Sequence, residues 1–132
     1  MFYAWDITIS ANTLDATPKE QILKLTHGIV TSIEIKFPSG CNGMVNVRIL
    51  HRRSQLVPLS SGEWVTGNDE TVPTETEFNL KANPFELIFV GCSPSTTYDH
   101  TITVRINIEK DISLLDKAIL DKLGSIEEAL TD

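Results

Sequence analysis

Hydrophobic and polar residues alternate along most of the first 109 residues of the chain. Near the start, Trp5, Ile7 and Ile9 alternate with polar residues, and residues 100–109 repeat the pattern with isoleucine and valine. A period of two is typical of a β-strand that buries one face. The pattern predicts strands within 3–10, 21–28, 29–37, 44–50, 74–80, 85–92 and 100–109.

Two of these regions carry more detailed predictions. In 29–37, a single face is expected to hold Ile29, Thr31, Ile33, Ile35 and Phe37. In 54–73, short apolar pieces around a tryptophan are mixed with turn residues. This second region is predicted to be a long excursion with at most one or two short strands.

About eight short strands separated by turn residues, with no helical pattern among them, are typical of an all-β antiparallel sandwich or barrel. One long irregular connection interrupts the series in the middle of the chain. We therefore expect an antiparallel β-sandwich of the jelly-roll kind, with an immunoglobulin-like sandwich as the second choice.

The period changes after residue 109, which divides the chain into a β-sandwich domain, 1–109, and a C-terminal amphipathic α-helix, 110–132. In the second region apolar residues recur at spacings of three and four, which places them on one stripe of a helix. The stripe consists of Ile112, Leu115, Ile119, Leu123, Ile126 and Leu130.

This stripe is the main candidate for oligomerisation or partner docking. A lone helix of about 20 residues is marginal in water, so another surface must cover its apolar face. From Ile119 to Leu130 the spacing follows a heptad seam, which favours self-association or docking on a neighbouring subunit. Folding back on the chain's own sandwich is the open alternative.

Composition is that of an ordinary folded protein. The chain has 132 residues, of which 41% are hydrophobic, and one domain of this size can build its own core. Residues 1–10 carry no signal-peptide pattern, and no apolar run approaches the roughly 20 residues of a membrane helix. We expect a protein made in the cytoplasm with no membrane partner.

Charge and cysteine content narrow the possible partners and cofactors. The formal net charge is −7, which disfavours nucleic acid because a phosphate backbone repels an acidic surface. The best basic candidate, residues 51–53, has no aromatic residues interleaved with it. Cys41 and Cys92 are expected to be buried or half-buried free thiols, with one cross-strand disulfide as the alternative.

No catalytic or metal-binding spacing is found in the sequence. The three histidines are scattered, and Asp99 and His100 are neighbours that a strand directs to opposite faces. Glu75 and Glu77 share a face, for which the solvated side of an edge strand is a simpler explanation than a calcium site. We expect a protein that is not an enzyme and needs no cofactor or metal.

Two loop aromatics offer an alternative function. Trp64 and Tyr98 could together form the flat platform on which carbohydrate-binding sandwiches stack a sugar ring. With 7% aromatic residues in the chain, this carbohydrate-binding module is the second hypothesis.

Three stretches carry a resemblance to a known group of proteins. They are AWDITISANT, LKLTHGIVTSIEIKFPSGCNGMVNVRI and TYDHTITVRI, which together span most of residues 4–106. They resemble small bacteriophage proteins of the virion, of the head decoration or cement type. The resemblance implies a β-rich, non-enzymatic protein that is located in the virion and binds the major capsid protein or another virion protein. It transfers no functional residue and does not include the segment after residue 111.

Overall fold

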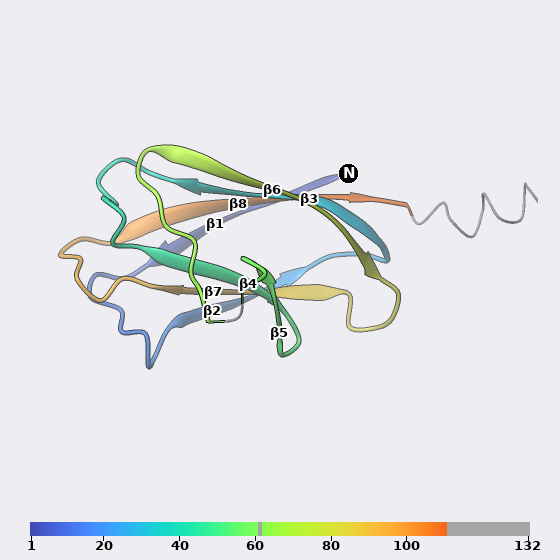
Figure 1. The fold of residues 1–132 in the computed structure, drawn as a ribbon, viewed down its shortest axis with the longest axis horizontal. Helices are drawn as coiled ribbons and strands as arrows, with labels where there is room; N and C mark the ends of the chain where they lie inside the picture. The colour runs from blue at the N-terminus through green and yellow to red at the C-terminus, as the bar shows by residue number, and fades with distance from the viewer. Residues whose placement is uncertain (61, 111–132) are drawn as a thin grey trace, which may run out of the picture.

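The computed structural model describes residues 1–60 and 62–110, which form eight β-strands in two antiparallel four-stranded sheets (Figure 1). Sheet A has the order β1-β8-β3-β6, and sheet B has the order β2-β7-β4-β5. The strands are β1 (Phe2–Ile9), β2 (Lys19–Lys24), β3 (Gly28–Phe37), β4 (Asn46–His51), β5 (Ser54–Val57), β6 (Glu70–Leu80), β7 (Glu86–Cys92) and β8 (His100–Glu109).

The hydrophobic core lies between the two sheets, which form separate layers in Figure 1. In β8 the isoleucines and Val104 point inward and are buried, while Thr101 and Arg105 are exposed. Sheet B contributes buried residues such as Leu87 and Phe89 to the same cluster. The predicted all-β sandwich is confirmed, and the strand expected at 100–109 coincides with β8.

A β-bulge in β3 overturns the prediction that 29–37 has one apolar face. The register of β3 shifts between Val30 and Ser32 against both β6 and β8. One extra residue in a strand exchanges the faces of the residues that precede it. Val30 is consequently buried in the core in place of Ile29, and Thr31 lies at the bulge.

The region 54–73 contains a short strand, as predicted, but it ends earlier than predicted. It contains β5, and Val65 forms an isolated bridge with Val47. β6 already begins at Glu70 and includes Pro73, so the expectation of irregular chain was wrong for the last four residues. β6 is an edge strand of sheet A, where a proline is tolerated because one side of the strand has no ladder to complete.

The predicted C-terminal helix, 110–132, lies outside the described residues except for Lys110, and its stripe lies wholly outside them, so both stay predictions. The described chain ends at Lys110, just after β8. Here Glu109 and Lys110 line a shallow hollow with Met1 and the β2–β3 loop residues Thr26 and His27. In the described part of the chain, no helix has the length and apolar character to cross a membrane.

Candidate docking surface on the outer face of sheet B

The outer face of sheet B carries a row of three apolar side chains. Ile22 on β2 pairs with Ile88 on β7, and Ile88 pairs with Leu50 on β4. Paired residues of an antiparallel sheet point to the same face, and the adjacent pair Leu23 and Leu87 is buried in the core. The row, called here the apolar row, therefore points away from the core.

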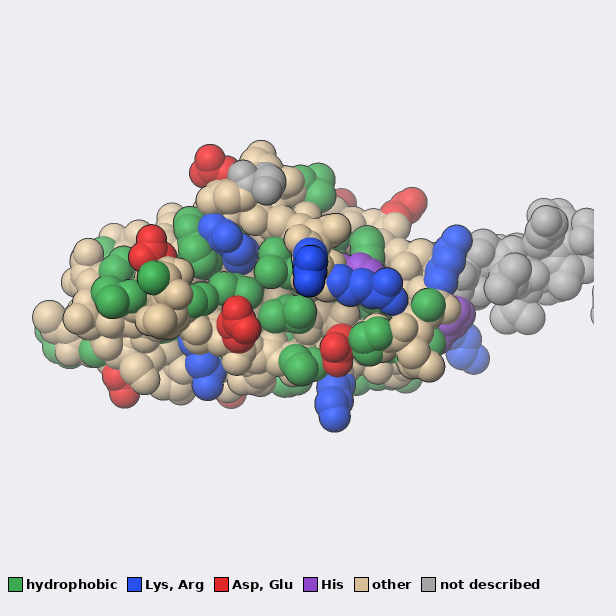
Figure 2. Space-filling view, turned by 90° about the horizontal axis from the view of Figure 1, so that it is seen from below, with side chains coloured by type: hydrophobic (Ala, Val, Ile, Leu, Met, Phe, Trp, Pro, Cys, Tyr) green, Lys and Arg blue, Asp and Glu red, His purple; other side chains and the backbone are tan. Residues whose placement is uncertain are grey.

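The apolar row is accessible to a partner. Ile22 is 53% exposed, and Ile88 and Leu50 are half-buried. Figure 2 looks onto this side of the molecule and shows hydrophobic side chains gathered over its centre. Exposed apolar side chains that form a continuous patch mark interaction surfaces more often than isolated ones do.

The sequence of β7 explains why this face is apolar. The strand reads ELIFVGC, a nearly continuous apolar run with Leu87 and Phe89 directed inward and Ile88 and Val90 directed outward. A continuous run is typical of a strand that is covered on both faces. This apolar run is the feature of the sequence that could have indicated a second covered face.

Part of the outer face is covered by the connection from β5 to β6. Val90 pairs with Arg48 on β4, and the Arg48 guanidinium carbon lies 3.5 Å from the centre of the Trp64 ring. Val90 is buried even though it points outward. The Arg48–Trp64 stack thus closes one side of the apolar row.

Gln55 fastens this connection to sheet B. Its amide nitrogen, which has two N–H donors to share, lies within hydrogen-bonding distance of three carbonyl oxygens, those of Pro58 at 2.7 Å, Ser60 at 2.8 Å and Glu63 at 3.0 Å. Its amide oxygen accepts from the Gly62 N–H at 3.2 Å. Arg48 also donates to the Gly62 carbonyl at 3.1 Å. These bonds fix the segment that presents Trp64.

Basic side chains gather at the end of the sandwich where β8 finishes. β2 and β4 end there and β7 begins there, because Lys24 pairs with Glu86 and Leu50 pairs with Ile88. The exposed cations at this end are Lys24, Arg52, Arg53, Lys81 and Lys110. They outnumber the acidic Glu86 and Glu109, and Figure 2 shows Lys and Arg toward this side.

The structure gives the two predicted sugar-platform residues different neighbours. Trp64 is half-buried with Arg48 over one face of its ring. Tyr98 is 71% exposed in the loop before β8, with its ring centre 6.3 Å from that of His100. One face of Trp64 is therefore already occupied within the chain.

Asp99 and His100 lie on opposite sides of the chain, as expected. Asp99 is exposed and accepts from the Ala11 N–H at 2.8 Å. His100 is buried with Nε2 3.3 Å from the Gly40 carbonyl oxygen. Within residues 1–60 and 62–110, no group of three or more His, Cys, Asp or Glu side chains could hold a metal ion.

Both cysteines are buried free thiols, as predicted. Burial raises the pKa of the Cys41 thiol. Burial also raises the pKa of Cys92, against the opposing effect of a hydrogen bond from Asn46 to its sulfur. Both thiols are therefore poor nucleophiles in the folded protein.

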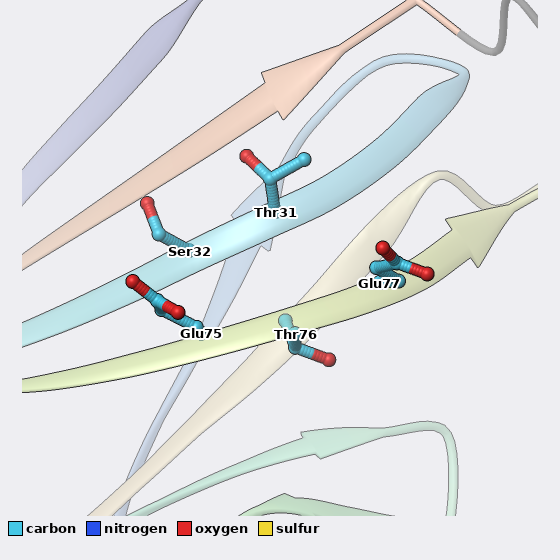
Figure 3. A pocket seen from close by; sticks show the side chains of 5 residues that line it. All are labelled: Thr31, Ser32, Glu75, Thr76 and Glu77. Atoms are coloured by element: carbon cyan, nitrogen blue, oxygen red, sulfur yellow. The ribbon is translucent and has the colours of Figure 1, made fainter.

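Glu75 and Glu77 lie on the solvent side of edge strand β6, as predicted. With Thr31 and Ser32 at the β3 bulge they line a shallow, open depression (Figure 3). Figure 3 shows Thr76 between them pointing to the other side of the strand. Two exposed carboxylates on a strand of this kind discourage pairing with another sheet edge.

The sequence matches no protein-family model and no curated protein.

Proposed function

We propose that this chain is a non-enzymatic structural protein of a bacteriophage particle. In this proposal it attaches to a protein shell as a decoration, cement or other head-associated protein, and it also associates with copies of itself. Its partner is the major capsid protein or another virion protein, and it is made in the host cytoplasm before joining the virion. Nucleic acid and membranes are not among its partners.

The observation that carries this proposal is the apolar row of Ile22, Ile88 and Leu50 on sheet B. A row of this kind on the outer face of a sheet suits a protein partner, because covering it removes apolar surface from water. The exposed Lys and Arg side chains at the end of the sandwich where β8 finishes would attract and orient an acidic partner.

Strand pairing supports a jelly-roll assignment within the sandwich class. β1 pairs with β8, β2 with β7, β3 with β6 and β4 with β5. This is the pairing of one long hairpin that has been rolled up into two sheets. Jelly rolls occur in viral capsid domains and also in lectins, so the assignment fits the proposal and leaves the carbohydrate-binding alternative to experiment.

Co-sedimentation tests the proposal directly. The purified protein is mixed with shells of the encoding virus that lack it, and bound protein is measured over a range of concentrations. We expect saturable binding at a fixed stoichiometry, weakened in Ile22→Asp. Failure to bind these shells, together with glycan-array binding that is lost in Trp64→Ala or Tyr98→Ala, would establish the carbohydrate-binding module instead.

A further inference from the structure

We propose that the apolar row on sheet B is the docking site for the C-terminal segment, residues 111–132, of a second copy of this chain. The inference rests on the self-association in the proposed function and supplies its two contacting surfaces. In this inference the predicted stripe of one copy binds to the outer face of sheet B of the other.

The apolar row matches the stripe in chemistry and in width. The row crosses three neighbouring strands, and with strands about 4.8 Å apart it spans about 10 Å, the diameter of one helix. Along the strands the row is one residue deep, because the outward neighbours of Ile88 on β7 are Glu86 and the buried Val90. One turn of a helix, with Ile119 and Leu123 of the stripe on one face, is therefore the part that matches the row.

The charges are also complementary. Residues 111–132 contain six acidic residues and two lysines, a net charge of −4. The end of sheet B carries exposed Lys24, Arg52 and Arg53, with Lys81 beside them. An acidic segment that approaches this face is therefore attracted at the basic end, with a strength that falls as salt screens the charges.

The position where β8 ends favours a second copy over the chain's own face. Glu109 is the last residue of β8 in sheet A, whereas the apolar row faces away from the core on sheet B. The sheets are about 10 Å apart, and the row lies two residues, about 7 Å, in from the end of β2. Ile112 is three residues after Glu109 and reaches at most about 11 Å. Ile112 therefore falls short of its own row, and only later residues such as Ile119, ten residues and at most about 36 Å after Glu109, could cover it. The row of a neighbour is open to every part of the stripe, which favours exchange between two copies.

Reciprocal exchange gives a closed dimer. If each copy places its segment on the partner's sheet B, both stripes and both apolar rows are covered and no binding surface is left open. Such an isologous twofold arrangement is the commonest closed assembly of identical chains.

Three variants test the docking surface in the full chain. Ile22→Asp alters the row at an exposed position, Leu123→Asp alters the stripe, and Phe2→Asp is a matched control. Phe2 is a strand residue on the other sheet and is 70% exposed. Analytical ultracentrifugation over a concentration series gives the dimer dissociation constant, and circular dichroism reports whether each variant keeps its fold.

We expect the unmodified protein and Phe2→Asp to dimerise equally. Ile22→Asp and Leu123→Asp should each weaken the dimer by about 100-fold, because each substitution removes two buried apolar side chains per dimer. Lys24→Glu and high salt should weaken it by smaller factors. An equimolar mixture of Ile22→Asp and Leu123→Asp should regain association, because a mixed dimer contains one docking contact between an intact segment and an intact row.

Other outcomes overturn the inference. A monomeric unmodified protein whose thermal stability falls in Leu123→Asp would mean that the segment covers its own domain. If Phe2→Asp and Ile22→Asp weaken the dimer equally, the outer face of sheet B is not the docking site. If the mixture of Ile22→Asp and Leu123→Asp stays monomeric, the segments are not exchanged between the two copies. Shell co-sedimentation by a monomeric protein would leave the proposed shell attachment standing, while the self-association and this inference both fall.

Discussion

The side chain of Ile9 fills the space that a side chain at position 91 would need. A Cβ atom built on Gly91 would lie 2.5 Å from Ile9 Cδ1 and 2.9 Å from Phe89 Cε1. Ile9 belongs to β1 in sheet A, and Gly91 belongs to β7 in sheet B. The glycine therefore lets the two sheets approach closely at this point.

Gly91→Ala should destabilise the fold by about 1–3 kcal/mol, because an extra methyl group must displace a packed neighbour. Ile9→Val removes the terminal methyl that lies closest to the new Cβ. The double variant Gly91→Ala with Ile9→Val should therefore lose less stability than the two single losses added together. Urea unfolding of the four proteins measures the coupling, and strictly additive losses would contradict this contact.

Gln55→Glu should loosen the connection between β5 and β6 more than Gln55→Ala does. The glutamate has nearly the same shape but brings a carboxylate oxygen against the three carbonyl oxygens that the amide nitrogen now serves. Loss of these bonds in the alanine variant should cost about 1–2 kcal/mol. Limited proteolysis with mass spectrometry should find new cleavage within 58–65, first in the glutamate variant. Equal protection of both variants would contradict the fastening role of Gln55.

Cys41 and Cys92 should resist thiol reagents until the protein unfolds. Both side chains are buried, and burial raises the pKa of each thiol, so the reactive thiolate is scarce and shielded. We expect 5,5′-dithiobis(2-nitrobenzoic acid) to label neither thiol rapidly at neutral pH and to label both at once in guanidinium chloride. Fast labelling of one thiol in the folded protein would mean that its surroundings open locally.

His51 should make the unfolding free energy rise with pH as the pH approaches 6.5 from below. Its ring centre lies 4.7 Å from that of Phe78, and its pKa is lowered from 6.5 by burial and by the nearby Arg52 charge. In the window between the lowered folded pKa and 6.5, the unfolded state binds more protons, so stability increases with pH there. Below that window the folded protein carries the full destabilisation caused by the lowered His51 pKa, and above 6.5 this destabilisation is absent.

Urea unfolding at several pH values measures this dependence, and His51→Gln should flatten it. His27→Gln is the matched control, because His27 also contacts a phenylalanine ring but is exposed. If the pH dependence is unchanged in His51→Gln but reduced in His27→Gln, His51 is not its source and the prediction is wrong.

The strand pattern could be predicted wherever one face of a strand is buried and the other is exposed. β8 is the clearest example, because Ile102, Val104 and Ile106 alternate with polar residues along the whole strand. One-sided burial imposes a period of two on the sequence, and this period needs no knowledge of the partner strand. The exposed position of Glu75 and Glu77 followed from the same alternation.

The docking surface could not be predicted in the same way. Ile22, Ile88 and Leu50 are far apart in the sequence, and only the registers of β2, β7 and β4 bring them into one row. The sequence pointed to Trp64 and Tyr98 as exposed aromatics, but it held no sign that Arg48 covers one face of Trp64.

The sequence by itself determined the all-β class, most of the strands and the change of period after residue 109, because local alternation reflects which side chains must leave water. Only the tertiary structure decided the order of strands in each sheet, the bulge beside Thr31 and the apolar row on sheet B. These features depend on pairing between distant segments, such as Phe2 with Asn107. The sequence around a residue does not identify the residue that pairs with it on another strand, because the energy of pairing arises only when the two strands meet.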